Sequence, residues 1–353
     1  MAIPFPKILK FLISLDIKPE RSIKIRIFTV PVLKIRTKTF SKIFKNIKDL
    51  FFYRRYKNVT AIKCPAPPDD ERFKWGDFWI AEDLKKIFEK NGQTVRIDFC
   101  NRFCYPADKK NIKTLTLRGL TEYIPPKNSK GKHILYILSH PNSVSLDEIS
   151  RFSAVACASL PYAEYLKKEG INCFFVPQFT DPEKFFPEPS DDFKTKVLFV
   201  GNSRGVFRNC VKFALEKNLP ITVYGGDWEQ FGVKTAGTGI KNTELHKYYS
   251  SADIVLCDHW DDMAKKGFIA NRIYDASACG AFIISDYVEA IERLYGDSIP
   301  MYRNADELKE LVDRYLNAPS ERKEKAERAK KITLKNFSVE KIALQLNELF
   351  DNV

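Results

Sequence analysis

The chain has 353 residues, with 58 Lys and Arg against 45 Asp and Glu, which gives a formal net charge of +13. This length predicts two domains, because single hydrophobic cores stop growing near ~250–300 residues. A hydrophobic content of 44% argues against a disordered or collagen-like chain. No apolar run approaches the ~20 residues of a membrane-spanning helix, and Lys7 and Lys10 interrupt any signal-peptide core. We therefore expect a cytoplasmic protein.

The positive charge is concentrated at one end of the chain. Residues 1–58 hold 15 basic and 3 acidic side chains, whereas the other 295 residues hold 43 basic and 42 acidic ones. The body of the protein is therefore nearly neutral. This distribution argues against a nucleic-acid-binding protein, for which basic residues would be spread over a folded face.

Residues 1–58 have the pattern of an attachment segment. Apolar residues recur at helical spacing over 5–13 and 40–51, with lysines between them, and residues 23–27 and 33–36 alternate apolar and basic side chains as strands do. A basic amphipathic segment of this kind lies on anionic lipid. The alternative is packing on the protein's own surface or on a partner protein.

From residue 59 onward, predicted strands and helices alternate. Strands are expected at 59–64, 94–99, 134–138, 154–158, 172–176, 196–200, 220–224, 254–257 and 281–285. Helices are expected at 80–91, 161–168, 207–217, 243–250, 271–279, 305–318, 320–336 and 338–350. This alternation predicts an α/β protein with two doubly wound, Rossmann-like domains and a basic N-terminal extension.

The predicted domain boundaries follow from these elements. Residues 1–58 form the extension, 59–185 an N-terminal domain and 196–336 a C-terminal domain. Residues 177–196, which contain four prolines and little periodicity, are the candidate linker. The last helix, within 337–353, is expected to cross back to the N-terminal domain.

Ligands of doubly wound sheets bind beyond the carboxyl ends of the strands, so these ends carry the candidate binding residues. The strand 196–200 runs into Gly201, Ser203 and Arg204, with Arg208 just before the next helix. Glycine allows close approach of a ligand to the backbone, arginines bind phosphate oxygens, and a helix N-terminus favours an anion. An ordinary strand–helix turn with solvated arginines is the alternative.

Two further strand ends are followed by candidate residues. After the strand 254–257 comes His259, and Asn271 then lies near a helix start with Asp275 one turn further on. His140 follows the buried strand 134–138, where it is either a general base or a contact to a bound ligand, or a structural loop histidine. The adjacent aspartate pairs lack Asp-x-Asp spacing and the eight cysteines form no CxxC pair, so no metal site is expected.

These motifs resemble a known family. DIVLCDHW, GFIANRIYDASACGAFIISD and the IERLYGD turn are similar to the donor-binding half of GT-B glycosyltransferases, closest to the CgeB-like branch of the family-1-type domain. Upstream of these motifs, the family's usual order is matched by WGDFWIAEDLKKIFEKNGQTVRIDF, ILYILSHP and VPQFTDPEKFFP. The resemblance therefore covers roughly residues 58–345.

The resemblance implies a role for each matching position. The implied donor-binding residues, with Asp275 at the ribose, are Gly201, Ser203, Arg204, Arg208, His259, Asn271, Arg272 and Asp275. The implied acceptor-side glycine turn contains Trp75, Gly76 and Asp77. Asp77 and His140 are the candidate catalytic residues. One position departs from the family, because Gly267 stands where retaining relatives carry a first glutamate, eight residues before the second carboxylate.

The resemblance implies metal-independent transfer of a sugar from a nucleotide sugar to a glycan or glycolipid acceptor, such as lipopolysaccharide or capsule. Basic residues and helix N-termini would replace the metal and any cofactor. The extension would hold the enzyme peripherally at the inner face of the cytoplasmic membrane. Two alternatives remain, a nucleotide-sugar 2-epimerase of the same fold and an inactive scaffold module.

Overall fold

The computed structural model describes residues 13–18, 22–27, 30–36, 59–103 and 112–353. The expected amphipathic helices over 5–13 and 40–51 lie outside these residues, apart from Ile13. The expected strands over 23–27 and 33–36 fall within β2 (Ser22–Ile27) and β3 (Val30–Arg36), which join β1 (Ile13–Lys18) in a three-stranded antiparallel sheet. No helix within the described ranges is long and apolar enough to cross a membrane.

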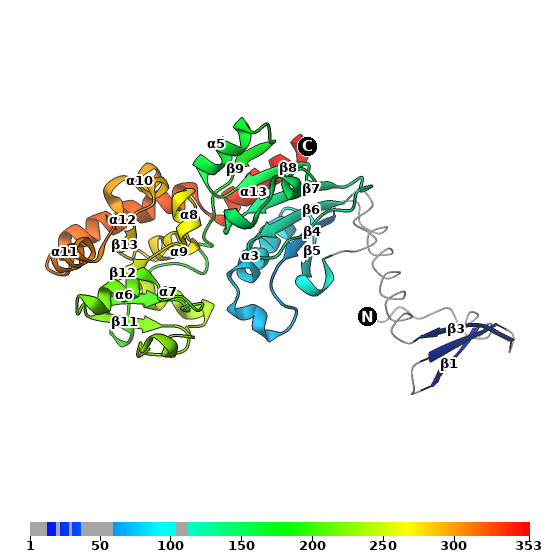
Figure 1. Cartoon of the computed structure of the whole chain (residues 1–353), viewed down its shortest axis with the longest axis horizontal. Helices are drawn as coiled ribbons and strands as arrows, with labels where there is room; N and C mark the ends of the chain where they lie inside the picture. Colours follow the sequence, from blue (N-terminus) through cyan, green and yellow to red (C-terminus); the bar gives the residue numbers. More distant parts are fainter. Residues whose placement is uncertain (1–12, 19–21, 28–29, 37–58, 104–111) are drawn as a thin grey trace.

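The N-terminal domain is a parallel sheet of order β5-β4-β6-β7-β8-β9 (Figure 1). Its strands are β4 (Val59–Cys64), β5 (Thr94–Phe99), β6 (Lys113–Arg118), β7 (Lys132–Ile137), β8 (Ala154–Cys157) and β9 (Cys173–Phe175). Its helices are α3 (Gly76–Lys90), α4 (Leu146–Ile149) and α5 (Leu160–Lys168). The sequence analysis did not predict β6 or α4, and it placed the start of α3 four residues too late.

The C-terminal domain is a second parallel sheet of order β11-β10-β12-β13-β14. Its strands are β10 (Thr195–Val200), β11 (Ile221–Tyr224), β12 (Ala252–Cys257), β13 (Ile283–Asp286) and β14 (Met301–Tyr302). Its helices are α6 (Asn209–Glu216), α7 (Leu245–Ser251), α8 (Asp261–Lys265), α9 (Asn271–Ala278), α10 (Glu289–Tyr295), α11 (Ala305–Leu316) and α12 (Pro319–Asn336). The expected architecture of two Rossmann-like α/β domains is confirmed.

Two chain crossings join the domains. The backbone of Thr180 in the linker pairs with Phe337 and Val339, where the chain returns from α12. The returning helix α13 (Val339–Asn352) then packs on α3 and β7, and its apolar face is buried in the core of the N-terminal domain (Figure 1). The Gln178 amide donates to Leu138 O at 3.0 Å and to Ile269 O at 3.2 Å, so the linker also ties β7 to the segment before α9.

The C-terminal domain also sends side chains into the N-terminal core. Met263 and Phe268, on either side of the turn after α8, are buried among the core residues of the first domain. The Ser159 hydroxyl at the start of α5 donates to Lys266 O. These contacts fix the relative position of the two domains at the edge of the cleft described next.

Candidate active site between the two domains

The carboxyl ends of β10 and β12 carry a cluster of arginines. A Cβ at Gly201, just after β10, would lie 2.8 Å from Arg272 Nη2 and 3.0 Å from Arg208 Nη1, so glycine leaves room for both guanidinium groups. Both groups also lie 4.9 Å from the Phe199 ring. Desolvation and the charges of Arg208 and Arg272 lower the pKa of Arg204, despite the opposing effect of Asp77 and Asp258. The cluster therefore has the electrostatics of an anion site.

These arginines are not equivalent. Arg208 Nε donates to Asp258 Oδ2 at 3.1 Å, and Arg208 Nη2 pairs with Asp258 Oδ1, so its charge is largely compensated. The Ser203 hydroxyl donates to Asp227 O and is buried. Contrary to expectation, Ser203 is therefore directed into its own domain and not at a diphosphate. Arg204 is the arginine of this turn that faces the other domain.

Helix α9 starts on the same side of the C-terminal domain. Asn271, its first residue, donates its amide to Asp275 Oδ2 at 2.8 Å. Burial raises the pKa of Asp275 to about 8, although the Thr180 hydroxyl and the Asn271 amide oppose this. Among the described residues, Asp275 Oδ1 and Asn271 Oδ1 have no hydrogen-bond partner. Two buried oxygens without partners fit hydroxyl groups of a ligand, because such atoms are costly to leave unpaired.

Asp77 and His140 stand on the opposite side of the cleft. A Cβ at Gly119, just after β6, would lie 3.2 Å from Asp77 Oδ1 and 3.4 Å from Ser139 Oγ, and Ser139 Oγ is 2.9 Å from His140 Nδ1. Burial raises the pKa of Asp77 to about 6, and Arg204 across the cleft partly opposes this. Burial lowers the pKa of His140. At neutral pH, Asp77 is mostly ionised and His140 mostly neutral.

Trp260 connects the two sides. Its ring centroid lies 6.0 Å from that of His140, and the Arg204 guanidinium lies 5.9 Å from the Trp260 ring. His140 and Arg204 both have left-handed backbones, with φ of 52° and 58°. Non-glycine residues in this conformation store strain and cluster at functional sites.

A buried ion pair holds the His140 loop in place. Arg118 Nε and Nη2 donate to the two carboxylate oxygens of Glu148 at 2.7 and 3.1 Å, and both residues are buried. The remaining Arg118 donors reach Gly119 O and Ser143 O, each at 2.6 Å. The Ser143 hydroxyl in turn donates to His140 O at 2.8 Å. Arg118 thus links the backbone beside Asp77 to the turn that carries His140.

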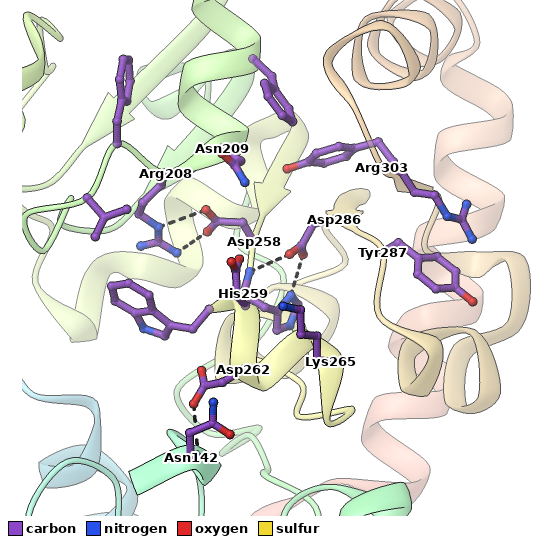
Figure 2. Close-up of a pocket in the computed structure, with 16 residues that line it drawn as sticks. Asn142, Arg208, Asn209, Asp258, His259, Asp262, Lys265, Asp286, Tyr287 and Arg303 are labelled. Atoms are coloured by element: carbon purple, nitrogen blue, oxygen red, sulfur yellow. Dashed lines mark hydrogen bonds and ion pairs between the residues drawn. The ribbon is translucent and has the colours of Figure 1, made fainter.

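A pocket of about 770 Å³ opens next to Trp260, as Figure 2 shows. His259 and Asp286 form its floor, with His259 Nδ1 2.6 Å from Asp286 Oδ1. Burial opposes ionisation of Asp286, but the His259 ring and backbone N–H still lower its pKa. His259 Nε2 has no partner among the described residues. Asn142 of the N-terminal domain reaches Asp262 on the rim through its N–H at 3.5 Å.

The expected acceptor-side glycine turn is instead the start of a helix. Gly76 and Asp77 are the first two residues of α3, and Trp75 is the cap residue before it. Trp75 packs against the core of the N-terminal domain, so its ring is engaged there. Asp77 still faces the cleft, because the first turn of α3 starts at that side.

At the family's glutamate position, the structure leaves no space for an acidic side chain. Gly267 has a φ of +70°, and a Cβ there would lie 2.5 Å from Pro161 Cγ at the start of α5. The glycine therefore lets the C-terminal domain close onto α5, and the sugar contact of retaining relatives has no counterpart at this position.

Sequence reasoning left Trp260 out of the candidate site, with packing as its default role, and missed Gly119 and the Arg118–Glu148 pair. An aromatic residue directly after the strand 254–257 was a usable signal for Trp260. Gly119 and Arg118 follow the strand that was not predicted, so their place at a strand end was not visible.

The chain is similar in sequence to known proteins over part of its length. A family model described as glycosyl transferase-like matches residues 204–348. The spore protein CgeB of Bacillus subtilis is 23% identical over 226 residues, covering 58% of this chain and 70% of that protein.

Solved structures share the two-domain arrangement. Sucrose-phosphate synthase from Thermosynechococcus elongatus superposes with a TM-score of 0.61 at 15% identity, covering 84% of this chain and 99% of that one. HepE from Anabaena, in complex with UDP-glucose, superposes with a TM-score of 0.59 at 12% identity, covering 84% and 100%. The fold is therefore GT-B. The glycosyl transferase-like match lies in the C-terminal domain, and the chain is similar to CgeB over part of its length.

Proposed function

We propose that this enzyme transfers a sugar from a nucleotide-activated donor to a bacterial surface glycan, such as lipopolysaccharide or capsule. The observation that carries the proposal is the cleft itself, where Arg204 faces Asp77 and His140 across Trp260. A cationic group on one side and a partly ionised carboxyl on the other suit the two halves of a glycosyl transfer. The UDP-glucose bound by HepE supports a nucleotide-sugar donor.

In this proposal, the C-terminal domain binds the leaving group. The diphosphate lies against Arg204 and the N-terminus of α9, while the unpartnered oxygens of Asn271 and Asp275 receive ribose hydroxyls. Positive charge placed in advance where negative charge develops lowers the barrier without reorganisation. Arg272 and the paired Arg208 add to the positive potential.

The N-terminal domain acts on the acceptor. An acceptor hydroxyl attacks the anomeric carbon, and the bond from that carbon to the diphosphate oxygen breaks. The hydroxyl proton passes to Asp77, whose pKa of about 6 leaves it ionised at neutral pH yet basic enough to accept it. His140 and Trp260 position the sugar between the two groups.

The proposal includes transfer without a metal or cofactor, because the arginines and the α9 N-terminus supply the positive charge. Once a nucleotide-sugar donor has been found by screening, turnover with it should be unchanged by excess EDTA. A loss that Mg²⁺ or Mn²⁺ restores would contradict metal independence.

A thermal-shift screen of nucleoside diphosphates tests the donor site. A ligand at 100 times its dissociation constant stabilises the protein by about 2.7 kcal/mol, which gives a clear shift. Arg204→Ala should remove most of the shift, and Arg293→Ala, an exposed arginine of α10, is the matched control. No shift with any nucleotide would favour the scaffold alternative. Epimerisation of a nucleotide sugar without acceptor would favour the epimerase.

Membrane attachment through residues 1–58 is part of the same proposal, at the inner face of the cytoplasmic membrane. Support comes from the sheet register, which pairs Ile23 with Ile35, Ile25 with Leu33 and Lys24 with Lys34. Apolar residues thus pair with apolar ones and lysine with lysine, and the apolar and basic pairs alternate along the strands, as in an amphipathic sheet.

Deleting residues 1–57 should abolish flotation with anionic vesicles and leave the nucleotide-induced thermal shift intact. If the truncated protein still floats with these vesicles, the attachment is elsewhere. Flotation should also fall with salt, because part of the attraction is electrostatic.

A further inference from the structure

A second hollow of about 490 Å³ lies beside the cleft and has no role in the donor site described above. One wall is Pro141, Val144 and Leu146 of the His140 loop and α4, and the other is Tyr162 and Tyr165 of α5. Lys265 and Lys266, at the end of α8, form the rim. We call this hollow the α5 groove.

The α5 groove adjoins the pocket beside Trp260. Asn142 and Lys265 line both the groove and the pocket beside Trp260. Asn142 is two residues from His140, in the turn that Arg118 holds in place. A molecule lying in the groove would therefore have one end at the turn that follows His140.

The walls of the groove suit a sugar ring. The Tyr162 and Tyr165 rings are stacked, with centroids 5.7 Å apart and an interplanar angle of 19°. Tyr165 is 45% exposed and Leu146 is 47% exposed, so apolar surface on both walls is open to solvent. Aromatic rings that present such a face bind the apolar face of a flat ligand at a small entropic penalty.

The rim of the groove suits an anion. Lys265 and Lys266 are adjacent, and among the described residues that line the groove none is acidic. The Lys266 ammonium lies 4.6 Å from the Tyr162 ring centroid, which places its charge directly over the aromatic wall. A ligand with a sugar face on the tyrosines would bring a neighbouring phosphate to these lysines.

We propose that the α5 groove is the acceptor subsite and that the acceptor is a saccharide bearing a phosphate group. The sugar stacks on Tyr165, the phosphate pairs with Lys265 and Lys266, and the reacting hydroxyl extends past Asn142 toward Asp77. The inference rests on the proposed glycosyl transfer and adds to it the class of acceptor.

Titration of the full chain with glucose 6-phosphate, followed by ligand-observed NMR, tests the groove. Methyl glucoside and inorganic phosphate are the two partial probes, and both should bind about tenfold more weakly than the sugar phosphate. Tyr165→Ala and Lys266→Gln should each weaken glucose 6-phosphate binding about fivefold to tenfold, since each removes one of the two contacts. Neither residue lines the pocket beside Trp260.

Two controls keep the outcomes separate. Leu215→Ala, an exposed apolar residue of α6, and Lys168→Gln, an exposed lysine on α5, should leave glucose 6-phosphate binding unchanged. The thermal shift by a nucleoside diphosphate should be the same in Tyr165→Ala as in the wild type, which also shows that this variant is folded.

The proposal is overturned if inorganic phosphate binds as tightly as glucose 6-phosphate, or if Tyr165→Ala binds it like the wild type. Either result, together with a normal nucleotide shift, refutes the acceptor subsite and leaves the proposed glycosyl transfer standing. Absence of any nucleotide shift would instead refute the proposed function.

Discussion

Replacing Asp275 by asparagine should stabilise the protein and weaken its nucleotide site. Asp275 is buried, and burial raises its pKa from 3.8 to about 8. Asparagine has nearly the same shape and keeps an oxygen that accepts from the Asn271 amide, which now binds Asp275 Oδ2 at 2.8 Å. It carries no ionisable proton, so it removes the free-energy penalty of a buried negative charge.

The sign of this stability change follows from proton binding. Between pH 3.8 and about 8, the folded protein holds the Asp275 proton and the unfolded chain has released it. Wild-type stability therefore falls as the pH rises through this window, by about 1.4 kcal/mol per pH unit for this one group. The stabilisation of Asp275→Asn over the wild type should be near zero at pH 4 and reach up to about 4 kcal/mol at pH 7.

Urea denaturation of both proteins at pH 5, 6, 7 and 8 measures this difference. A constant offset reports the changed hydrogen bond, and only the dependence on pH reports the buried charge. Asp147→Asn, which alters an exposed carboxyl in the first turn of α4, is the matched control. Nucleotide affinity measured on the same samples should fall in Asp275→Asn, because the ribose loses a partner.

Two results would refute this reasoning. If the stability difference between Asp275→Asn and the wild type is the same at every pH, Asp275 does not titrate in the raised range. If nucleotide affinity is unchanged, Asp275 does not contact the nucleotide, whatever its pKa. Higher stability with lower affinity is the signature of a residue kept for function at the expense of folding.

Three further predictions concern the rest of the cleft. Asp77→Asn should lower turnover about 10²-fold to 10⁴-fold while nucleotide affinity is retained. The wild-type rate should fall as the pH drops through about 6, because Asp77 becomes protonated. If the variant shows the same pH–rate profile as the wild type, Asp77 is not the base. Arg118→Met should lower the free energy of unfolding by about 3–5 kcal/mol, because it leaves Glu148 buried without its partner. Urea denaturation of the double variant Arg118→Met, Glu148→Leu should show that most of the lost stability returns. If the single and double variants lose the same stability, the ion pair is not the cause. Gly267→Ala should lower stability by about 1–3 kcal/mol, since its Cβ would meet Pro161 Cγ at 2.5 Å. Thermal unfolding should show a smaller stability loss when Pro161 is also replaced by glycine. An equal loss in the two backgrounds would contradict the steric explanation.

The predicted elements that matched best were those with a strong local pattern. The strands at 59–64 and 94–99 have the predicted bounds, and α9 and α12 begin within one residue of theirs. Each is a continuous apolar or periodic run bounded by proline, glycine or a polar turn, so neighbouring residues suffice to define it.

The elements that were missed or shifted lack such a local signal. Gly76 is a weak helix former, so the start of α3 was read as a turn, yet the first residue of a helix tolerates glycine. Helices α4, α8 and α10 are only one or two turns long, too short for helical periodicity to emerge.

The sequence by itself determined that the chain is two parallel α/β domains and where along the chain most of their strands end. Hydrophobic periodicity and glycine turns are local properties, and parallel sheets place all their carboxyl ends on one side. It also located the excess of positive charge in residues 1–58.

Only the tertiary structure decided which of these side chains meet. The pairing of Arg208 with Asp258, the position of Trp260 between His140 and Arg204, and the exclusion of a side chain at Gly267 all depend on distant segments. The same holds for the raised pKa of Asp77 and Asp275, which comes from burial between elements far apart in sequence. Contacts of this kind arise when segments distant in sequence pack together, within one domain or between the two, and no local pattern records them.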